Sequence, residues 1–357
     1  MAVGAQRERM KMLLAREEQE WLRERSSEWA ELETVPEDIV EWLVRRRMFK
    51  LFVPAAFGGG EQSLTEAVRL YEALAEADGS VAWLVQIGAG GGFFVPSFAP
   101  EIAQQFFSGE GAVIAGSGAV AGTARRVAGG YRVSGRWRYA SGAQYATLFT
   151  ANARVQETGA VRAFAWLPEQ VRLERDWRAL GMRATSSWSF TVDDVFVPEE
   201  RSFVVGQKLW KPGLLVYELP FEFFATASIG AVALGLAQAF FQELETMERP
   251  AAVRADLPRW RGLLEYARRM FHETVNWAEK TTAVAGEKQS EQEGLEEWML
   301  RGAFQIARQC VLEALPAVGM VVILEGNTIG RIARDFLTIC QHRVLRRPEW
   351  AWEGGRS

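Results

Sequence analysis

The hydrophobic pattern of this chain changes period twice, and this change constrains the fold more than any other feature. Up to about residue 110, apolar residues recur every three to four positions, which is typical of amphipathic helices. Between residues 111 and 205, short segments alternate in polarity or are rich in β-branched residues, with Gly-Gly, Ser-Gly and Asp-Asp turns between them. From residue 206 the helical period returns. The pattern predicts a mainly helical α+β protein with a β-region between two helical regions.

We expect these regions to be three domains, because a chain of 357 residues is longer than one core usually supports. Residues 1–110 predict a helical domain, in which Ser63 and Glu66 form a capping box that opens one helix. Residues 111–205 predict a small β-barrel or sandwich. Residues 206–357 predict a four-helix bundle. Its expected helices are 221–247, 257–285, 291–315 and 323–345.

The charge and the soft metal ligands exclude several classes of function. A net charge of -4 gives no basic surface for nucleic acid. The two cysteines, Cys310 and Cys340, lack metal-ligand spacing and predict no metal site, and their low number fits a reducing cytoplasm. The N-terminus lacks the apolar core of a signal peptide. The most apolar stretch, 223–241, contains Ser228 and Gln238, so we expect a buried helix and no membrane contact.

Two glycine runs invite a nucleotide-binding interpretation that their context does not favour. "GAGGGFF", residues 88–94, follows an apolar helix and no strand, so it is not a dinucleotide fingerprint. "FGGG", from Phe57, reads as a turn. Glycine clusters mark turns or close backbone approach. Approach to a flat ring system is the alternative for residues 88–94.

Four segments together resemble the acyl-CoA dehydrogenase superfamily. "LFVPAAFGG" is similar to its Val-Pro-x-x-x-Gly-Gly turn, and "AEADGSVAWLV" resembles the helix that follows. "AGSGAVAGTARRVAGGYRVSGRWRYASGA" is similar to the first strands of its β-domain, and "ALGMRATSSWSFTVDDVFVPEER" to its signature Gly-Met-Arg-x-Thr-x-Ser followed by Val-Asp-x-Val-x-Val-Pro. The resemblance spans about residues 35–342. It implies a cytoplasmic flavin-dependent oxidoreductase that assembles as a homotetramer or homodimer.

Two chemistries occur in that superfamily, and the C-terminal motif resembles one of them. Acyl-CoA dehydrogenases oxidise a Cα–Cβ bond, whereas two-component monooxygenases use oxygen and reduced flavin (FAD or FMN) from a separate reductase. "RIARDFLTICQH" matches the monooxygenase pattern Arg-x-x-Arg-Asp with a histidine seven residues later, at Arg331, Arg334, Asp335 and His342. "WRYASG" resembles the same branch. The implied substrate is a small aromatic or amine.

The resemblance also implies roles for individual residues. Ser141 would place a hydroxyl, which can donate a hydrogen bond, near the N5–C4a edge of the flavin, and Tyr139 would flank the ring. His342 would act as the base for a phenol, although a lone histidine is also a common packing residue. Asp335 would orient His342, or else pair with Arg331 or Arg334. The expected flavin contacts are Tyr139, Ala140, Ser141, Ser117, Arg183, Ser186 and Arg331.

Departures from the pattern leave two alternatives open. The chain has no histidine in its first 271 residues, where these monooxygenases often carry one, and its tail after His342 is short. His272 matches no motif and reads as a surface or packing residue. "ILEGNTIGR" would make Glu325 the base of an acyl-CoA dehydrogenase, although the Arg-Phe-Gly motif of those enzymes is missing. The other alternative is a non-catalytic binding or assembly protein.

Overall fold

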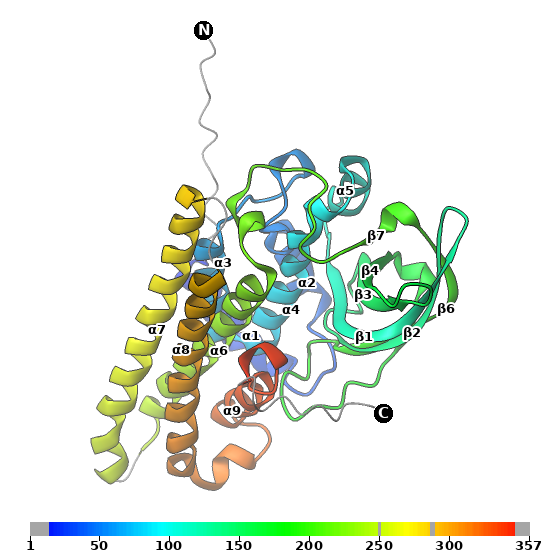
Figure 1. Ribbon diagram of the computed structural model, residues 1–357. Helices are drawn as coiled ribbons and strands as arrows, with labels where there is room; N and C mark the ends of the chain where they lie inside the picture. Colours follow the sequence, from blue (N-terminus) through cyan, green and yellow to red (C-terminus); the bar gives the residue numbers. More distant parts are fainter. Residues whose placement is uncertain (1–13, 249–250, 286–289, 347–357) are drawn as a thin grey trace.

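The computed structural model describes residues 14–248, 251–285 and 290–346, and the outer ends of both predicted helical domains lie outside these residues (Figure 1). Helices precede the sheet, strands form the middle of the chain, and helices follow. The helices before the sheet are α1 (Arg16–Arg25), α2 (Glu37–Arg45), α3 (Leu64–Ala77), α4 (Gly79–Gly90), the 3-10 helix η4 (Gly91–Ser97) and α5 (Pro100–Phe107). The helices after it are α6 (Phe221–Thr246), α7 (Ala251–Ala285), α8 (Ser290–Val318), the 3-10 helix η8 (Gly319–Ile323), α9 (Thr328–Ile339) and the 3-10 helix η9 (Arg343–Leu345).

The middle region is one mixed seven-stranded sheet that curls around its own aromatic core (Figure 1). Its strand order is β5-β6-β2-β1-β3-β4-β7, with β1 and β3 parallel and the other pairs antiparallel. The strands are β1 (Ile114–Val127), β2 (Gly130–Ala140), β3 (Leu148–Val155), β4 (Val161–Trp166), β5 (Arg172–Glu174), β6 (Trp188–Pro198) and β7 (Ser202–Phe203). Trp137 stacks on Phe190 inside this sheet. The alternating pattern predicted the long strands, but β5 and β7 are too short to show a period.

Helix α6 lies at the centre of the helical part and is buried along most of its length. It is long and apolar enough to cross a membrane, but 89% of its most apolar window is buried inside the protein, so it is a core helix as expected. Small residues allow its neighbours to approach. A Cβ on Gly235 would lie 2.3 Å from the Glu72 carbonyl oxygen, and one on Gly230 would lie 2.8 Å from the Phe271 ring.

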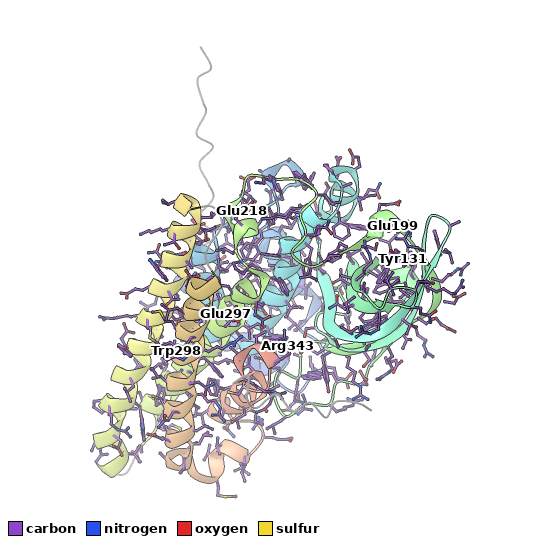
Figure 2. The ribbon with its side chains drawn as sticks, viewed as in Figure 1. Tyr131, Glu199, Glu218, Glu297, Trp298 and Arg343 are labelled. Atoms are coloured by element: carbon purple, nitrogen blue, oxygen red, sulfur yellow. The ribbon has the colours of Figure 1, made fainter. Side chains whose placement is uncertain are left out.

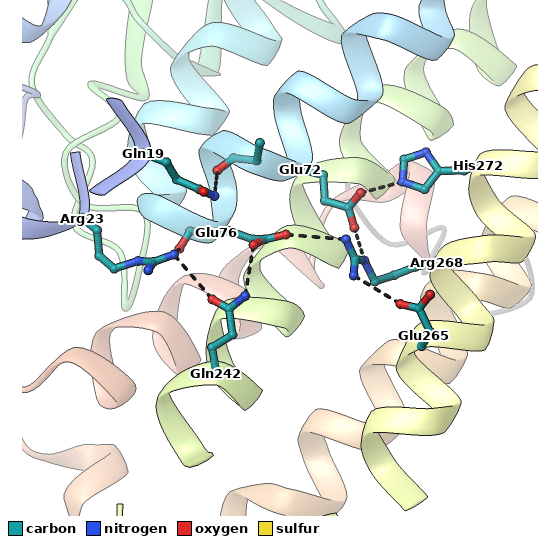
Figure 3. A network of polar contacts seen from close by, with 9 residues as sticks. Gln19, Arg23, Glu72, Glu76, Gln242, Glu265, Arg268 and His272 are labelled. Atoms are coloured by element: carbon teal, nitrogen blue, oxygen red, sulfur yellow. Dashed lines mark hydrogen bonds and ion pairs between the residues drawn. The ribbon is translucent and has the colours of Figure 1, made fainter. Parts of the chain in front are cut away.

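A buried ionic network joins α3 to α7 (Figure 3). Glu72 lies 2.5 Å from both Arg268 Nε and His272 Nε2, and these partners hold its pKa below the usual range despite burial. Glu76, one turn later, bonds Gln242 and has a raised pKa because it is buried. His272 is therefore a packing residue with a carboxylate partner, consistent with the expectation.

Two of the helices, α9 and α7, have bounds that differ clearly from the prediction. Helix α9 spans Thr328–Ile339 and not 323–345, because Asn327 caps its N-terminus by accepting a hydrogen bond from Gly330 N–H at 2.7 Å. Helix α7 begins at Ala251, before the predicted break ends, and continues through Pro258. Val253 and Leu257 pack against the core there, and such packing can outweigh a local signal for a loop.

The glycine run of residues 88–94 is helical, in α4 and η4, and close approach explains its glycines. A Cβ on Gly88 would lie 2.6 Å from Phe49, and one on Gly91 would lie 2.4 Å from Ile114. These glycines therefore allow protein side chains to approach. The run at Phe57 is a turn as expected, with Gly58 at φ +75°.

Candidate functional site

A chain of buried hydroxyl groups begins at the C-terminal end of β2. Ser141 Oγ accepts a hydrogen bond from Trp83 Nε1 of α4 at 2.8 Å and lies 2.7 Å from Ser187 Oγ. Ser187 Oγ lies 2.6 Å from Thr185 Oγ1, which donates to the Met182 carbonyl at 2.8 Å. We call Trp83, Ser141, Ser187 and Thr185 the hydroxyl chain. It joins α4, the end of β2 and the segment before β6.

Backbone hydrogen bonds hold the segment before β6 against the end of β2. Gly142 N–H donates to the Thr185 carbonyl at 2.8 Å, and Ala143 N–H donates to that of Ser186 at 3.2 Å. Tyr139 and Ser186 both adopt positive φ, at 68° and 47°. Positive φ is uncommon for residues other than glycine and is held here by the surrounding contacts. The geometry of the hydroxyl chain is therefore built into the backbone on both sides.

His342 lies against the same tryptophan. Its ring meets that of Trp83 edge-on, with centroids 5.6 Å apart. Its Nδ1 atom is buried and has no hydrogen-bond partner within the described residues. Burial, together with Arg343 and Arg346, lowers the pKa of His342 to about 4, so the imidazole is neutral at physiological pH. A neutral imidazole with a free ring nitrogen can accept a proton.

Arg331 and Asp335 of the motif Arg-x-x-Arg-Asp form a separate group of polar contacts with Asp78, Ser26 and Met182. We call these five residues the latch. Arg331 bonds Asp78 Oδ2 and Ser26 Oγ, both at 2.7 Å. Asp335 Oδ1 accepts a hydrogen bond from Met182 N–H at 2.5 Å. The expectation that Asp335 orients His342 is wrong in this structure, because Asp335 lies on the face of α9 that packs on Met182.

The latch connects three elements: α4, the segment before β6, and α9. Asp78 caps α4, where it accepts a hydrogen bond from Val81 N–H, and Trp83 follows five residues later. Met182 is the residue whose carbonyl ends the hydroxyl chain. Asp335 lies on α9, after which the chain turns to His342. We therefore interpret Arg331 and Asp335 as positioning residues.

The raised pKa of Asp335 predicts that the stability of the protein depends on pH. Burial raises its pKa from 3.8 to about 7, with Asp78 adding to the rise and Arg331 opposing it. Between about pH 4 and pH 7 the folded state holds this proton more tightly than the unfolded chain, so the free energy of unfolding should fall as pH rises through that window. Asp335→Asn keeps an oxygen for Met182 N–H and should remove most of the fall. Urea unfolding at pH 5 and pH 8 measures it, and an equal fall in both proteins would contradict the assignment.

The other predicted site residues lie at different depths. Tyr139 is 63% exposed and packs edge-on against Trp177, whereas Ala140 is buried. Ser117 lies half-buried in β1, where its register with β3 shifts. Arg183 points to the surface and pairs with Glu31.

Ser186 and Glu325 are the remaining predicted site residues. Ser186 is buried and donates to the Glu33 carbonyl. Glu325 is exposed before α9, at the end of the helix opposite His342. Ser141 and His342, which the motifs indicated, thus meet at Trp83, and the described contacts place none of the others there.

One face of α4 and η4 is less buried than the rest of these helices. Ile87 and Gly90, and Phe94 of η4, are only partly buried, although most of their neighbours on these helices are buried. A Cβ on Gly90 would have no heavy atom nearer than 3.9 Å. Further along η4, Phe93 lines a cavity of about 270 Å³ together with Tyr217, Phe221 and other residues. Partly buried apolar side chains and aromatic cavity walls of this kind can line a site for an aromatic ligand.

Two members of the hydroxyl chain were missed by sequence reasoning. Trp83 and Thr185 were not proposed as site residues. The spacing of Thr185 and Ser187 in an extended segment, which places both on one side, is the signal that could have found them. Nothing in the sequence alone indicates that Trp83 reaches Ser141.

Comparison with known proteins agrees with this architecture. Residues 6–101 match the family described as acyl-CoA dehydrogenase, N-terminal domain. An indole-3-acetate monooxygenase of Pseudomonas putida is 26% identical over 342 residues, covering 90% of this chain and 87% of that protein. The oxygenase subunit HsaA, a flavin-dependent monooxygenase of Rhodococcus jostii, is 30% identical over 230 residues, covering 60% and 59%.

Solved structures share the fold over nearly the whole chain. The 3-HSA hydroxylase from Rhodococcus sp. RHA1 superposes with a TM-score of 0.83 at 22% identity and covers 92% of this chain and 90% of its own. XiaF from Streptomyces sp., in complex with FADH2 and glycerol, has a TM-score of 0.79 at 20% identity and covers 92% of both chains.

Proposed function

We propose that this chain, which has the acyl-CoA dehydrogenase fold and resembles the flavin-dependent monooxygenases of that superfamily, is the oxygenase component of a two-component monooxygenase. The observation that carries the proposal is that the Ser141 hydroxyl and the neutral His342 imidazole both contact Trp83. Both residues come from motifs that resemble this branch. Glu325, the base required by the dehydrogenase alternative, is exposed at the far end of α9, roughly 18 Å away along the helix.

Each residue has a task that its position allows. When bound, a reduced flavin would supply the capacity to react with oxygen. Tyr139 would flank its ring, and Ser141 would hydrogen-bond its edge. His342 would accept the phenolic proton of a substrate at an imidazole nitrogen; its Nδ1 atom has no hydrogen-bond partner among the described residues. Burial of Ser141 would help keep water from the reacting atoms.

We propose a small aromatic substrate, an assignment supported by the cavity beside η4. Phe93, Tyr217 and Phe221 give it aromatic walls. Rings of this kind favour aromatic ligands through edge-to-face and offset contacts. A cavity of about 270 Å³ is close to the size range of small-molecule sites.

We propose that the cofactor is FAD or FMN delivered in its reduced form by a separate flavin reductase in the cytoplasm. The relatives named above include flavin-dependent oxygenase subunits and a structure with FADH2. The test is to combine the chain with a flavin reductase, NADH and oxygen-18 and to offer phenols and indoles. Product with one labelled oxygen supports the proposal. No binding of reduced or oxidised flavin would contradict it and favour the non-catalytic alternative.

We also propose assembly with further copies of the chain through α8 and η8. The segment Gly294–Ile323 is long and apolar enough to span a membrane, but only 28% of its most apolar window is buried inside the protein. Trp298 is 70% exposed on α8 (Figure 2), and Met320 and Ile323 are 68% and 65% exposed on η8. Large exposed apolar side chains on one helix mark a protein interface. A second copy is the partner that fits the resemblance.

Trp298→Glu should therefore shift the protein to a smaller assembly. A charge in an apolar interface is costly because it must be desolvated. Light scattering after size exclusion measures the mass, and Glu273→Gln, a change on α7, is a control for altered surface charge. A wild-type monomer would refute the assembly proposal, and an unchanged oligomeric mass in Trp298→Glu would exclude this surface as the interface.

A further inference from the structure

The hydroxyl chain has a preferred direction, and this direction determines what Ser141 offers to a ligand. Trp83 Nε1 can only donate, and the Met182 carbonyl can only accept. Each of the three hydroxyls between them carries one proton and can accept two hydrogen bonds. All four contacts lie between 2.6 and 2.8 Å. The protons of the chain can therefore be ordered in one of two ways.

In the inward order, Ser141 donates to Ser187, Ser187 donates to Thr185, and Thr185 donates to the Met182 carbonyl. Every hydroxyl proton then has a protein acceptor. In the outward order, Thr185 donates to Ser187 and Ser187 to Ser141, and the proton of Ser141 is left without a protein partner. The inward order makes one more buried hydrogen bond, so it predominates unless a ligand accepts from Ser141.

In the inward order Ser141 has already donated its proton, and one of its lone pairs accepts from Trp83. It presents one remaining lone pair and acts toward a ligand as an acceptor. From the sequence we instead expected Ser141 to donate a hydrogen bond. A reduced flavin carries a proton on N5 and can donate there, whereas oxidised flavin has a bare N5 that only accepts.

We infer that the hydroxyl chain selects reduced over oxidised flavin by presenting Ser141 as a hydrogen-bond acceptor. The inference rests on the proposed function, because it places the flavin edge at Ser141. Thr185 and Ser187 are positioning residues for this selection, since they fix the proton of Ser141 from a distance. A two-component oxygenase needs this preference, because it receives reduced flavin and must release the oxidised form.

Thr185→Val tests the inference without altering Ser141. Valine cannot accept the Ser187 proton, so the inward order loses its extra hydrogen bond and Ser141 becomes free to donate to a ligand. Met182 O retains its hydrogen bond from Trp177 Nε1 at 2.8 Å. The ratio of the Kd for oxidised FAD to the Kd for dithionite-reduced FAD, measured by anaerobic equilibrium dialysis, should fall by about three- to tenfold, the equivalent of one hydrogen bond. Thr185→Ser keeps the hydroxyl and should keep the wild-type ratio.

Ser187→Ala is the second variant. It also frees the Ser141 proton and should lower the ratio, and it replaces Thr185→Val if that protein fails to fold. Wild-type binding of reduced FAD with an unchanged ratio in both variants would overturn the inference and leave the proposed function standing. Binding of neither form by the wild-type protein would overturn the proposed function, and the inference with it.

Discussion

Replacing Arg331 by methionine should destabilise the protein by about 3–5 kcal/mol at pH 8, the usual cost of removing one partner of a buried ion pair. The Asp78 side chain is 2% exposed and Arg331 is its ion-pair partner at 2.7 Å. Asp335 lies in the same buried group, and Arg331 is the strongest influence that favours its charged form. Without the arginine, two buried carboxyl groups face each other. Urea unfolding followed by circular dichroism measures the change.

Arg334→Met is the matched control, because it alters the second arginine of the same motif. Arg334 Nη1 bonds only the Leu324 carbonyl, at 3.2 Å, in an exposed position. Its replacement should cost less than about 1 kcal/mol. Equal effects of the two substitutions would show that the latch does not hold the fold together.

Replacing His342 by glutamine should lower turnover of a phenolic substrate by about 10²- to 10⁴-fold, the usual contribution of a general base. Glutamine keeps polarity at the position but cannot accept a proton. Oxidation of flavin without product formation should increase at the same time, because the bound flavin still reacts with oxygen. Product yield per NADH consumed, in the reductase-coupled assay, measures both effects.

The pH profile gives an independent check on the same residue. Because the pKa of His342 is about 4, its imidazole stays neutral down to about pH 5, and turnover should fall only as pH approaches 4. A fall near pH 6.5 would indicate an unburied histidine and contradict the assignment. His272→Gln, at the other histidine of the chain, is the control and should leave turnover unchanged.

The fold could be anticipated because its elements are long and periodic. The alternation around Trp137 and Phe190 predicted β2 and β6, and the capping box at Ser63 is confirmed by a hydrogen bond from Glu66 N–H. The start of α7 could not be anticipated, because Val253 packs against the core there and such packing is not a local signal. The three predicted domain boundaries stay a prediction, although one hydrophobic core extends through both helical regions.

The site could be anticipated only in part, because its members are far apart in the sequence. Motifs indicated Ser141 and His342, and the structure brings both to Trp83. The tryptophan could not be found from spacing, since it reaches Ser141 across 58 residues. The role given to Asp335 was wrong for a related reason. Seven residues on a helix predicted a shared face with His342, but α9 ends at Ile339 and the chain turns before the histidine.

The measurement that tests the central claim most directly is stopped-flow mixing of the protein and chemically reduced flavin with oxygen. It requires no knowledge of the substrate. The account predicts that the return of oxidised-flavin absorbance is slower than for free flavin, and that the delay is shortened in Ser141→Ala. Reoxidation identical to that of free flavin at saturating protein would contradict the assignment of this site to reduced flavin and oxygen.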